Sequence, residues 1–500
     1  MADKQQKIKV PILPPLVRKS LESGLILPLA VGENRMPETA CSESINWDFP
    51  TIGAAKTRQG VTQIGNTLSG NILGIHQFID TVAGTNTKLI TVNGTTAYYL
   101  NSGTWTSKRT GLTAGSKAQF ADFLNATFMV NGTEATAMWD GGAGNFVTTG
   151  SASGAPIGKY IATFVGRIWI SGNPTHPDRV YWSTRPTLAT NQTVSWVTSD
   201  TDDSQWGDIS PNDGENVTAM KKYKNWLVVF KQNRIYKISN ISTVDQDPGY
   251  VVGTYSAESV VETKEGLFFH HSSGFYQFNV YGILQEISIP ILDIVRAIPA
   301  SAYSSVAGWI DPLDADHINW SIGTVTYGGV TYQNMVVRYR LSTQVWSHRS
   351  YPTQFLCSGR YTDGTTLFNV VGGTNGKTYQ YNLGTTDDGT PISYSLIHRW
   401  ENIDGLLSTR KVIQTMLFNH YGGAGSNVSY QVEGDPETDW SKRVGKGQFG
   451  QYNTGFNSVG IKGRKIRIRI SGQNVGQPIV YHGYECIGAM DELITFTNNG

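Results

Sequence analysis

The residues of this chain that could do chemistry are carboxylates and histidines in short clusters. Asp311-x-x-Asp314-x-Asp316 carries three carboxylates close together, and His270-His271 directly follows an apolar run. The carboxylates are ligands that Ca²⁺ accepts, but the calcium-binding loop with its terminal Glu is missing, so the pattern favours a turn. Adjacent residues of a strand point to opposite faces, so we do not expect the two histidines to share a metal.

Signatures of enzymes are largely missing from the sequence. The nearest approach to the Ser-x-Asp-x-Gly-x-x-Trp box of propeller glycosidases lies at residues 362–368, and its spacing does not fit. Further carboxylates, which a retaining glycosidase would need to pair at about 5 Å, occur at 202–203 and 387–388. The motifs of zinc sites, serine hydrolases and phosphate-binding loops do not occur. We therefore expect no catalytic residue, no metal and no cofactor.

The strongest local charge feature is basic. Residues 465–470 alternate strictly between cations and isoleucines, which predicts a strand with the isoleucines inward and the cations outward. A solvated strand face, a nucleic-acid contact and a subunit contact are all compatible with such a stripe. We expect a subunit interface, because Arg can make bidentate contacts with a neighbour's carboxylates. The candidate interface residues are Lys462, Arg464, Arg467 and Arg469.

The structural elements that would position a functional site are seven segments that resemble one another in sequence. Five read strand–turn–strand and two looser copies follow, near residues 335–337 and 367–370, at a spacing of roughly 40 residues. That period is typical of propeller blades, so we expect an all-β chain with a β-propeller of about six to seven blades. Asn-Gly pairs at 93–94 and 131–132 predict tight type I′ hairpins. The five clear copies span residues 89–100, 128–139, 168–182, 227–238 and 267–278.

The blade pattern suggests three parts. Residues 1–60 begin with a proline-rich stretch that holds basic and apolar positions, which is typical of an extended N-terminal arm, and we expect this arm to pack on a neighbouring subunit. Residues 61–392 form the predicted propeller, with a short helix expected at 291–296. Residues 393–500 carry longer strands at 412–418, 428–432 and 461–470, which predict a C-terminal β-sandwich or barrel-like domain.

Composition narrows the class of protein. Charged residues make up 16% of the chain, against about 25% in typical soluble domains, while aromatic residues reach 11%. Such a surface favours a protein covered by neighbours in an assembly. The net charge of +1 does not indicate a nucleic-acid binder. The three widely spaced cysteines imply no disulfide framework, and no apolar run reaches the length of a membrane span.

Three segments resemble tail nozzle and tail hub proteins of short-tailed bacteriophages. Residues 45–49 and 57–60 are similar to that family's N-terminal N-x-x-x…K-R-P-G motif, with Gln59 in place of the proline. Residues 175–183 resemble its H-P-D-R-x-x-x-S blade edge. Residues 208–238 follow the order of its G-x-I-x-G-I…W-x-x-x-I-V-F…S-x-I-x-x-F/Y pattern. These motifs fall within residues 45–290, and none of them is catalytic.

The resemblance implies a virion structural protein of the phage tail, made in the host cytoplasm. In that family a propeller-bearing subunit forms a homo-hexameric ring below the portal and adaptor proteins, with tail fibre or spike proteins at its side. The ring closes the channel until infection and then conducts DNA during ejection. The resemblance implies no enzymatic step, no cofactor and no membrane span.

Two other functions stay open on the sequence alone. One is a receptor- or carbohydrate-binding propeller at the tail tip, in which Trp105, Trp139, Trp182 and Trp206 would stack on sugars. The other is a propeller glycosidase, which would need two carboxylates paired in a cleft.

Overall fold

A computed structural model of the chain describes residues 16–18, 21–27, 35–51, 54–82, 87–186, 193–198, 204–241, 249–402, 409–422, 427–435, 443–447, 453–474 and 476–493. The chain divides into two compact units. One comprises Thr62–Ser342 and Tyr351–Tyr381, and the other comprises Met1–Val61, Thr343–Ser350 and Asn382–Gly500. In the described ranges no helix is long and apolar enough to cross a membrane.

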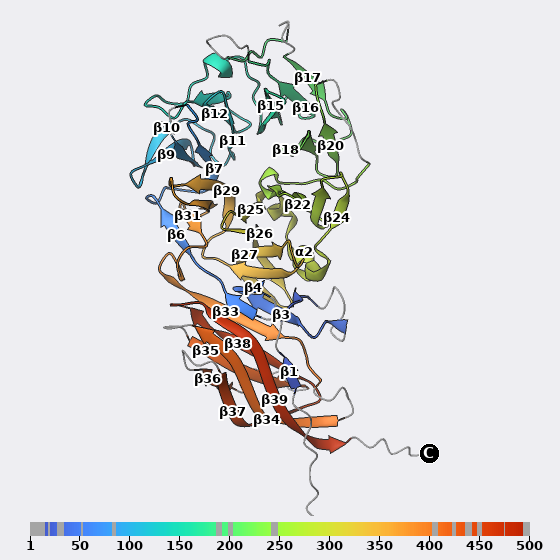
Figure 1. The fold of residues 1–500 in the computed structure, drawn as a ribbon. Coiled ribbons are helices and arrows are strands. Elements are labelled where there is room, and N and C mark those ends of the chain that lie inside the picture. The colour runs from blue at the N-terminus through green and yellow to red at the C-terminus, as the bar shows by residue number, and fades with distance from the viewer. Residues whose placement is uncertain are drawn as a thin grey trace, which may run out of the picture. The chain divides into compact units, whose positions relative to one another are not determined.

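The first unit is a seven-bladed β-propeller, in agreement with the predicted fold class. Each blade is a small antiparallel sheet, and in Figure 1 strands such as β11, β18 and β25 face the middle of the ring while β10, β17 and β24 form its rim. The first four blades are β7–β10 (Ile72–Phe78, Lys88–Asn93, Thr96–Asn101, Thr104–Arg109), β11–β13 (Gln119–Phe123, Ala126–Val130, Ala137–Trp139), β14–β17 (Tyr160–Phe164, Arg167–Ser171, Arg179–Trp182, Gln205–Asp208) and β18–β20 (Ala219–Tyr223, Trp226–Phe230, Ile235–Ile238). The last three are β21–β24 (Val261–Glu262, Gly266–His271, Gly274–Asn279, Leu284–Glu286), β25–β27 (Ala307–Asp311, Asp314–Tyr327, Val330–Arg340) and β29–β31 (Phe355–Thr362, Leu367–Gly373, Thr378–Tyr381).

The ring closes with a strand from the N-terminal side of the first blade. Strand β6 (Val61–Ile64) precedes β7 in sequence but pairs with β31, the outer strand of the seventh blade. The backbone N–H of Leu68 then donates to the carbonyl of Gly376 at 2.9 Å. Gly376 has φ of +75°, and a Cβ there would lie 1.9 Å from the carbonyl oxygen of Leu68. Only glycine fits this closure without displacing the backbone.

The seven similar sequence segments fall one to a blade, on its second and third strands or on one of them. These strands alternate apolar residues onto both faces, because each blade is covered by its neighbours. Between the third and fourth blades, for example, Trp169 and Trp182 lie 4.9 Å apart and pack with Leu227 and Val229. The expected helix is confirmed as α2 (Leu292–Ala297).

Both Asn-Gly pairs lie between paired antiparallel strands, which confirms the predicted hairpins, but neither forms a type I′ turn. In the first, Asn93 ends β8 and pairs with Thr96, so the turn residues are Gly94 and Thr95, with φ of +56° at Gly94. In the second, β12 ends at Val130 and β13 begins only at Ala137. Asn131 there accepts hydrogen bonds from the backbone N–H groups of residues 133 and 134, because an Asn side chain can itself close a turn.

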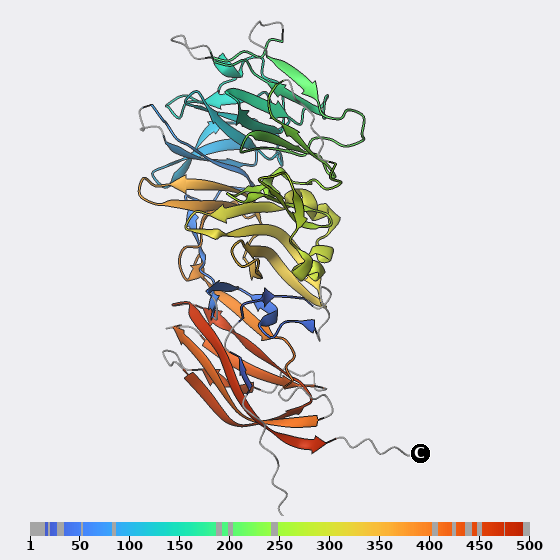
Figure 2. The ribbon, with the colours of Figure 1, turned by 45° about the vertical axis from the view of Figure 1, so that its right-hand side comes forward.

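The second unit is a β-sandwich, which confirms the C-terminal domain type. One sheet has the order β37-β34-β39-β5-β4, with β1 also on β39, and the other runs β28-β3-β33-β38-β35-β36, with β2 also on β3. Phe418 of one sheet stacks on Tyr430 of the other at 4.0 Å between ring centres. The long strands run side by side, orange to red in Figure 2. Their bounds are β1 (Leu16–Arg18), β2 (Gly24–Leu25), β3 (Ala40–Ile45), β4 (Trp47–Thr51), β5 (Ala54–Thr57), β28 (Trp346–Ser350), β32 (Thr386–Asp387), β33 (Thr390–His398), β34 (Thr409–Gly422), β35 (Asn427–Gly434), β36 (Arg443–Gly447), β37 (Asn453–Gly463), β38 (Ile466–Asn474) and β39 (Ile479–Leu493).

The boundaries of the parts differ from those expected. The propeller ends at Tyr381 and not near 392, since β32 and β33 belong to the sandwich, and residues 343–350 also leave the propeller to supply β28. Much of the expected N-terminal arm lies outside the described residues (1–15, 19–20 and 28–34). Its described parts pair within the chain, where β1 pairs with β39 and β3 pairs with β33. Extended segments complete the sandwich because their backbone groups find partners at its strand edges.

Candidate functional site

The segment that resembles a family blade edge, residues 175–183, holds two strands of the third blade together. Arg179 on β16 donates to both carboxylate oxygens of Asp208 on β17, at 2.7 and 3.1 Å. Its guanidinium also covers the face of Trp206 at 3.4 Å. The hydrogen bond from Arg179 lowers the pKa of Asp208. Arg179 therefore stabilises the contact between β16 and β17, and its guanidinium and the Asp208 carboxylate are both occupied by this pairing.

The residue before it, Asp178, links the third blade to the fourth. Lys231 follows β19, its side chain is fully buried, and its Nζ lies 3.0 Å from Asp178 and 2.7 Å from Asp213. The N–H of Ile209 donates to the carbonyl of Asp178 at 2.9 Å, so the backbone is held as well. Burial alone would raise the pKa of Asp213, but the hydrogen bond from Lys231 and other donors bring it below its usual value. We name Asp178, Arg179, Asp208, Asp213 and Lys231 the inter-blade clasp.

The N-terminal motif builds a second buried ionic centre, inside the sandwich domain. Arg58 donates to both oxygens of Asp387 at 2.7 and 2.6 Å and to Asn46 Oδ1 at 2.7 Å. Two backbone carbonyls, at residues 59 and 350, accept its remaining hydrogen bonds at 3.0 and 2.6 Å. All five donor positions of the guanidinium are thereby used. Arg349 pairs in the same bidentate way with Asp48, at 3.0 and 2.6 Å.

A cavity of about 1180 Å³ lies at the centre of the propeller. Every one of the seven inner strands contributes to its wall, from β7 to β29. His76 in this wall stacks on Phe120 at 5.3 Å and has its Nε2 2.7 Å from Asp122. Charged residues of both signs line the rest: Lys221, Lys224, Lys264, Arg360, Glu258, Glu262, Glu265 and Asp316. Such a mixed lining has no preference for one sign of ligand charge.

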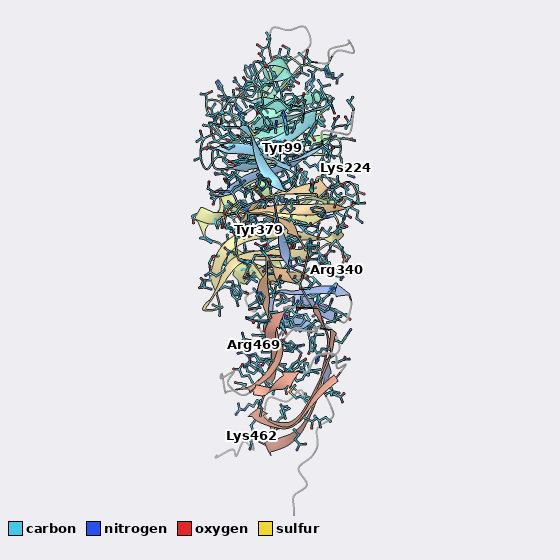
Figure 3. All side chains as sticks on the ribbon, turned by 90° about the vertical axis from the view of Figure 1, so that its left-hand side faces the viewer. Tyr99, Lys224, Arg340, Tyr379, Lys462 and Arg469 are labelled. Atoms are coloured by element: carbon cyan, nitrogen blue, oxygen red, sulfur yellow. The ribbon has the colours of Figure 1, made fainter. Side chains whose placement is uncertain are left out.

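The candidate interface residues do not share one strand face. The expected strand 461–470 is interrupted: β37 ends at Gly463 in the sheet of β34, and β38 begins at Ile466 in the sheet of β33 and β35. A Cβ on Gly463 would lie 2.7 Å from the carbonyl of residue 465, so glycine permits this close approach of the backbone. Lys462 and Arg469 accordingly stand apart on the sandwich in Figure 3.

The four candidates differ in their surroundings. Lys462 and Arg464 are exposed. Arg467 pairs with the buried Glu433 of its own chain at 2.5 Å and lies over the ring of Trp400, and Arg469 donates to Ser395 Oγ at 3.2 Å. The predicted alternation within β38 is confirmed, since Ile466, Ile468 and Ile470 are all buried. Of the four candidates, Lys462 and Arg464 are therefore the most accessible to an external partner.

The tryptophans proposed for sugar stacking are not placed for it. Trp105, Trp139 and Trp182 are buried in the blades. Trp206 is 43% exposed, but Arg179 covers its ring. The sugar-stacking hypothesis for these residues is therefore wrong, because aromatic rings in this repeat fill the spaces between blades.

The carboxylate clusters are engaged in turns and ion pairs. Asp311 accepts from the N–H of Leu313, as the turn interpretation predicts. Asp314 is bonded to His317 and Arg338, and Asp316 to Arg340 at 2.7 Å. Residues 202–203 lie outside the described residues. No group of metal-ligating side chains occurs in the described ranges.

The two adjacent histidines face different surroundings, as expected for a strand. His271 has its ring nitrogens 2.7 Å from Ser273 Oγ and 3.1 Å from Asn233 Oδ1. His270 is fully buried between the rings of Phe275 and Tyr303, and neither of its nitrogens has a hydrogen-bond partner among the described residues. Burial, and secondarily the charge of His271, lowers the pKa of His270 to about 3.

The comparisons with known proteins bear on the fold alone. No protein-family model matches the chain, and no curated protein matches it. Among solved structures, Sqt1 of Saccharomyces cerevisiae is 9% identical with a TM-score of 0.39, over 65% of this chain and 99% of that one. YCF48 bound to D1 peptide is 12% identical with a TM-score of 0.38, over 65% and 96%. The computationally designed Ika8 protein is 11% identical with a TM-score of 0.36, over 65% and 100%.

Likenesses this distant carry no argument about function. The propeller assignment rests on the seven blades, their order and the closing strand. The buried cations Arg349 and Lys231 could not have been singled out from the sequence, since nothing in their neighbours distinguishes them from surface cations. Arg58 lies in a segment noted only for its resemblance to a family, and that resemblance did not indicate burial.

Proposed function

We propose that this chain is a structural subunit of a bacteriophage tail, of the nozzle or hub class, without an enzymatic step. It forms a homo-oligomeric ring below a portal and adaptor complex, closes the channel for DNA, and lets DNA pass on infection. One observation carries the proposal. Two of the segments that resemble that class, around Arg58 and around Asp178-Arg179, form ion pairs within the domains, and the cations Arg58 and Lys231 of these pairs are buried.

The position of the propeller cavity bears on the path of DNA in such a ring. The cavity of about 1180 Å³ is lined by the blades of one propeller, whereas the channel of such a ring is lined by all of its subunits. DNA in the proposed assembly therefore passes along the axis between copies of the chain, outside the propeller cavity. The propeller itself serves as a rigid body in the ring wall.

Charge also suits this role. With 40 basic and 39 acidic residues the chain has almost no net charge, and the buried cations Arg58 and Arg349 are paired with carboxylates of the same chain. Each lysine or arginine that contacted phosphate would retard the passage of DNA. We place Lys462 and Arg464, which are exposed, at the contact between neighbouring subunits.

The oligomeric state tests the proposal. The purified chain is measured by light scattering and imaged by negative stain, alone and with a portal–adaptor complex. We expect rings of six copies that stack on the complex. A trimer, as is common for receptor-binding proteins, or a monomer that ignores the complex would contradict the proposal.

A further inference from the structure

A lysine amine meets a side-chain amide inside the β-sandwich. Lys411 on β34 is 1% exposed, and its Nζ lies 2.6 Å from Oδ1 of Asn402 and 3.0 Å from the carbonyl oxygen of Arg464. Ile413, two positions along the strand, is fully buried, so Lys411 projects into the same space between the two sheets. The first of these hydrogen bonds holds the amine beside the asparagine side chain.

A buried carboxylate faces the same space. Glu401 directly precedes Asn402 and is 1% exposed. Its backbone forms an antiparallel bridge with Ile466 of β38, with hydrogen bonds of 2.7 and 2.9 Å. Bridge partners place their side chains on one face of the sheet, and Ile466 is buried, so Glu401 points into the interior. Arg399 donates to the Glu401 carboxylate at 3.3 and 3.4 Å, which are long distances for charged partners.

We propose that Lys411 and Asn402 join in an intramolecular isopeptide bond. Glu401 takes a proton from the ammonium group, and the neutral Nζ attacks Cγ of Asn402. A new N–C bond forms, Glu401 passes its proton to Nδ2, and the Cγ–Nδ2 bond breaks. The departing ammonia takes the second proton of Nζ and leaves as ammonium, so Glu401 ends as it began. Lysine and asparagine side chains thus become one secondary amide, and no oxidant, reductant or further reactant takes part.

The inter-blade clasp explains why this chemistry belongs to one buried lysine and not to the other. Lys231 is also fully buried, but it faces the carboxylates of Asp178 and Asp213. Hydrogen bonds keep the pKa of Asp213 below its usual value, so this carboxylate is ionised near neutral pH. An ionised carboxylate resists attack by an amine, so Lys231 has no neighbouring group with which to form an amide. Asn402 presents a neutral amide instead.

The bond would tie the two sheets of the sandwich covalently. Lys411 belongs to the sheet of β34, while the segment that carries Asn402 is bridged to β38 of the other sheet. Sheets joined in this way cannot slide apart under load without breaking a covalent bond. The inference rests on these contacts alone and holds whether or not the chain is a tail subunit.

Peptide mass spectrometry of the full-length protein tests the bond directly. Trypsin cuts after Arg399, Arg410 and Lys442, so the linked protein yields a branched peptide in which 400–410 is joined to 411–442. We expect this species at the summed mass of its two arms less one ammonia. The peptide containing Lys231 is the internal control and should be linear. Linear peptides alone, at the masses given by the sequence, would overturn the proposal.

Loss of ammonia without a branch is a separate outcome and also counts against the bond. Asn402 could close on its own backbone to a succinimide, which has the same mass loss but leaves the two arms unlinked. The variants separate the roles. Lys411→Arg keeps a cation but, always protonated, should show no linkage. Glu401→Gln should lose most of the linkage. Asn402→Asp should show none, because it presents Lys411 with a carboxylate, as the clasp does to Lys231.

Discussion

Replacing Asp387 by asparagine should destabilise the sandwich domain far more than the same change at an exposed carboxylate. Arg58 is buried and uses all of its donors, and two of these go to Asp387, which is itself buried. The amide that replaces the carboxylate in the D387N variant carries no charge, so the guanidinium is left without its counter-ion. Removing one partner of a buried pair typically costs about 3–5 kcal/mol.

The matched control is Glu38→Gln in the same domain. Glu38 is paired with Arg399 at 3.5 Å, but its side chain is 63% exposed. Exposed pairs contribute about 0–1 kcal/mol, because water screens the charges. Both substitutions change a carboxylate to an amide, so their difference isolates the effect of burial.

Urea unfolding followed by hydrogen exchange measures the two variants. Peptides that cover β32 and β33 report the sandwich separately from the propeller, which matters if the two units unfold in separate steps. We expect the exchange-detected midpoint of these peptides to fall by an amount equivalent to about 3–5 kcal/mol for D387N and at most about 1 kcal/mol for E38Q. Equal shifts for the two variants would refute the assignment of Arg58 and Asp387 as a buried lock.

Three further predictions follow from the described contacts. The pKa of His270 is lowered from its unfolded value near 6.5 to about 3 in the fold, so the propeller should have its full stability above about pH 6.5 and lose up to about 1.4 kcal/mol per pH unit below it. Urea titrations at several pH values should show a weaker pH dependence of stability for His270→Phe. An unchanged dependence would show that another group is responsible. Gly376→Ala should destabilise the propeller by more than Gly115→Ala. The two glycines have similar φ angles, but only at Gly376 would a Cβ also meet backbone, the carbonyl oxygen of Leu68. Equal shifts in melting temperature would mean that φ strain alone matters. Reversing the charges of Lys462 and Arg464 together should change the free energy of unfolding by no more than about 0.5 kcal/mol but abolish ring assembly, as measured by light scattering. Intact rings would show that these residues are not part of the interface.

The repeated sequence pattern was enough to predict the propeller, its number of blades to within one, and the presence of a second β domain. Each blade repeats one local pattern of apolar strands and turns, and local patterns are readable because neighbours in sequence decide them. The alternation of residues 466–470 likewise predicted a buried row of isoleucines, which β38 has.

The tertiary structure decided which charged residues are buried and with what partners. Arg58 and Asp387 are 329 positions apart, and Arg349 and Asp48 are 301 apart, so no local pattern connects them. The same holds for the borders of the domains, since strands near the N-terminus complete a sandwich made mostly by the last hundred residues. Residues 461–470 read as one strand because basic residues continue across 462–465. Only the pairing of β37 and β38 in different sheets shows that the strand is interrupted after Gly463. Pairing across such distances depends on how the whole chain packs, and that information is not carried by residue type and spacing alone.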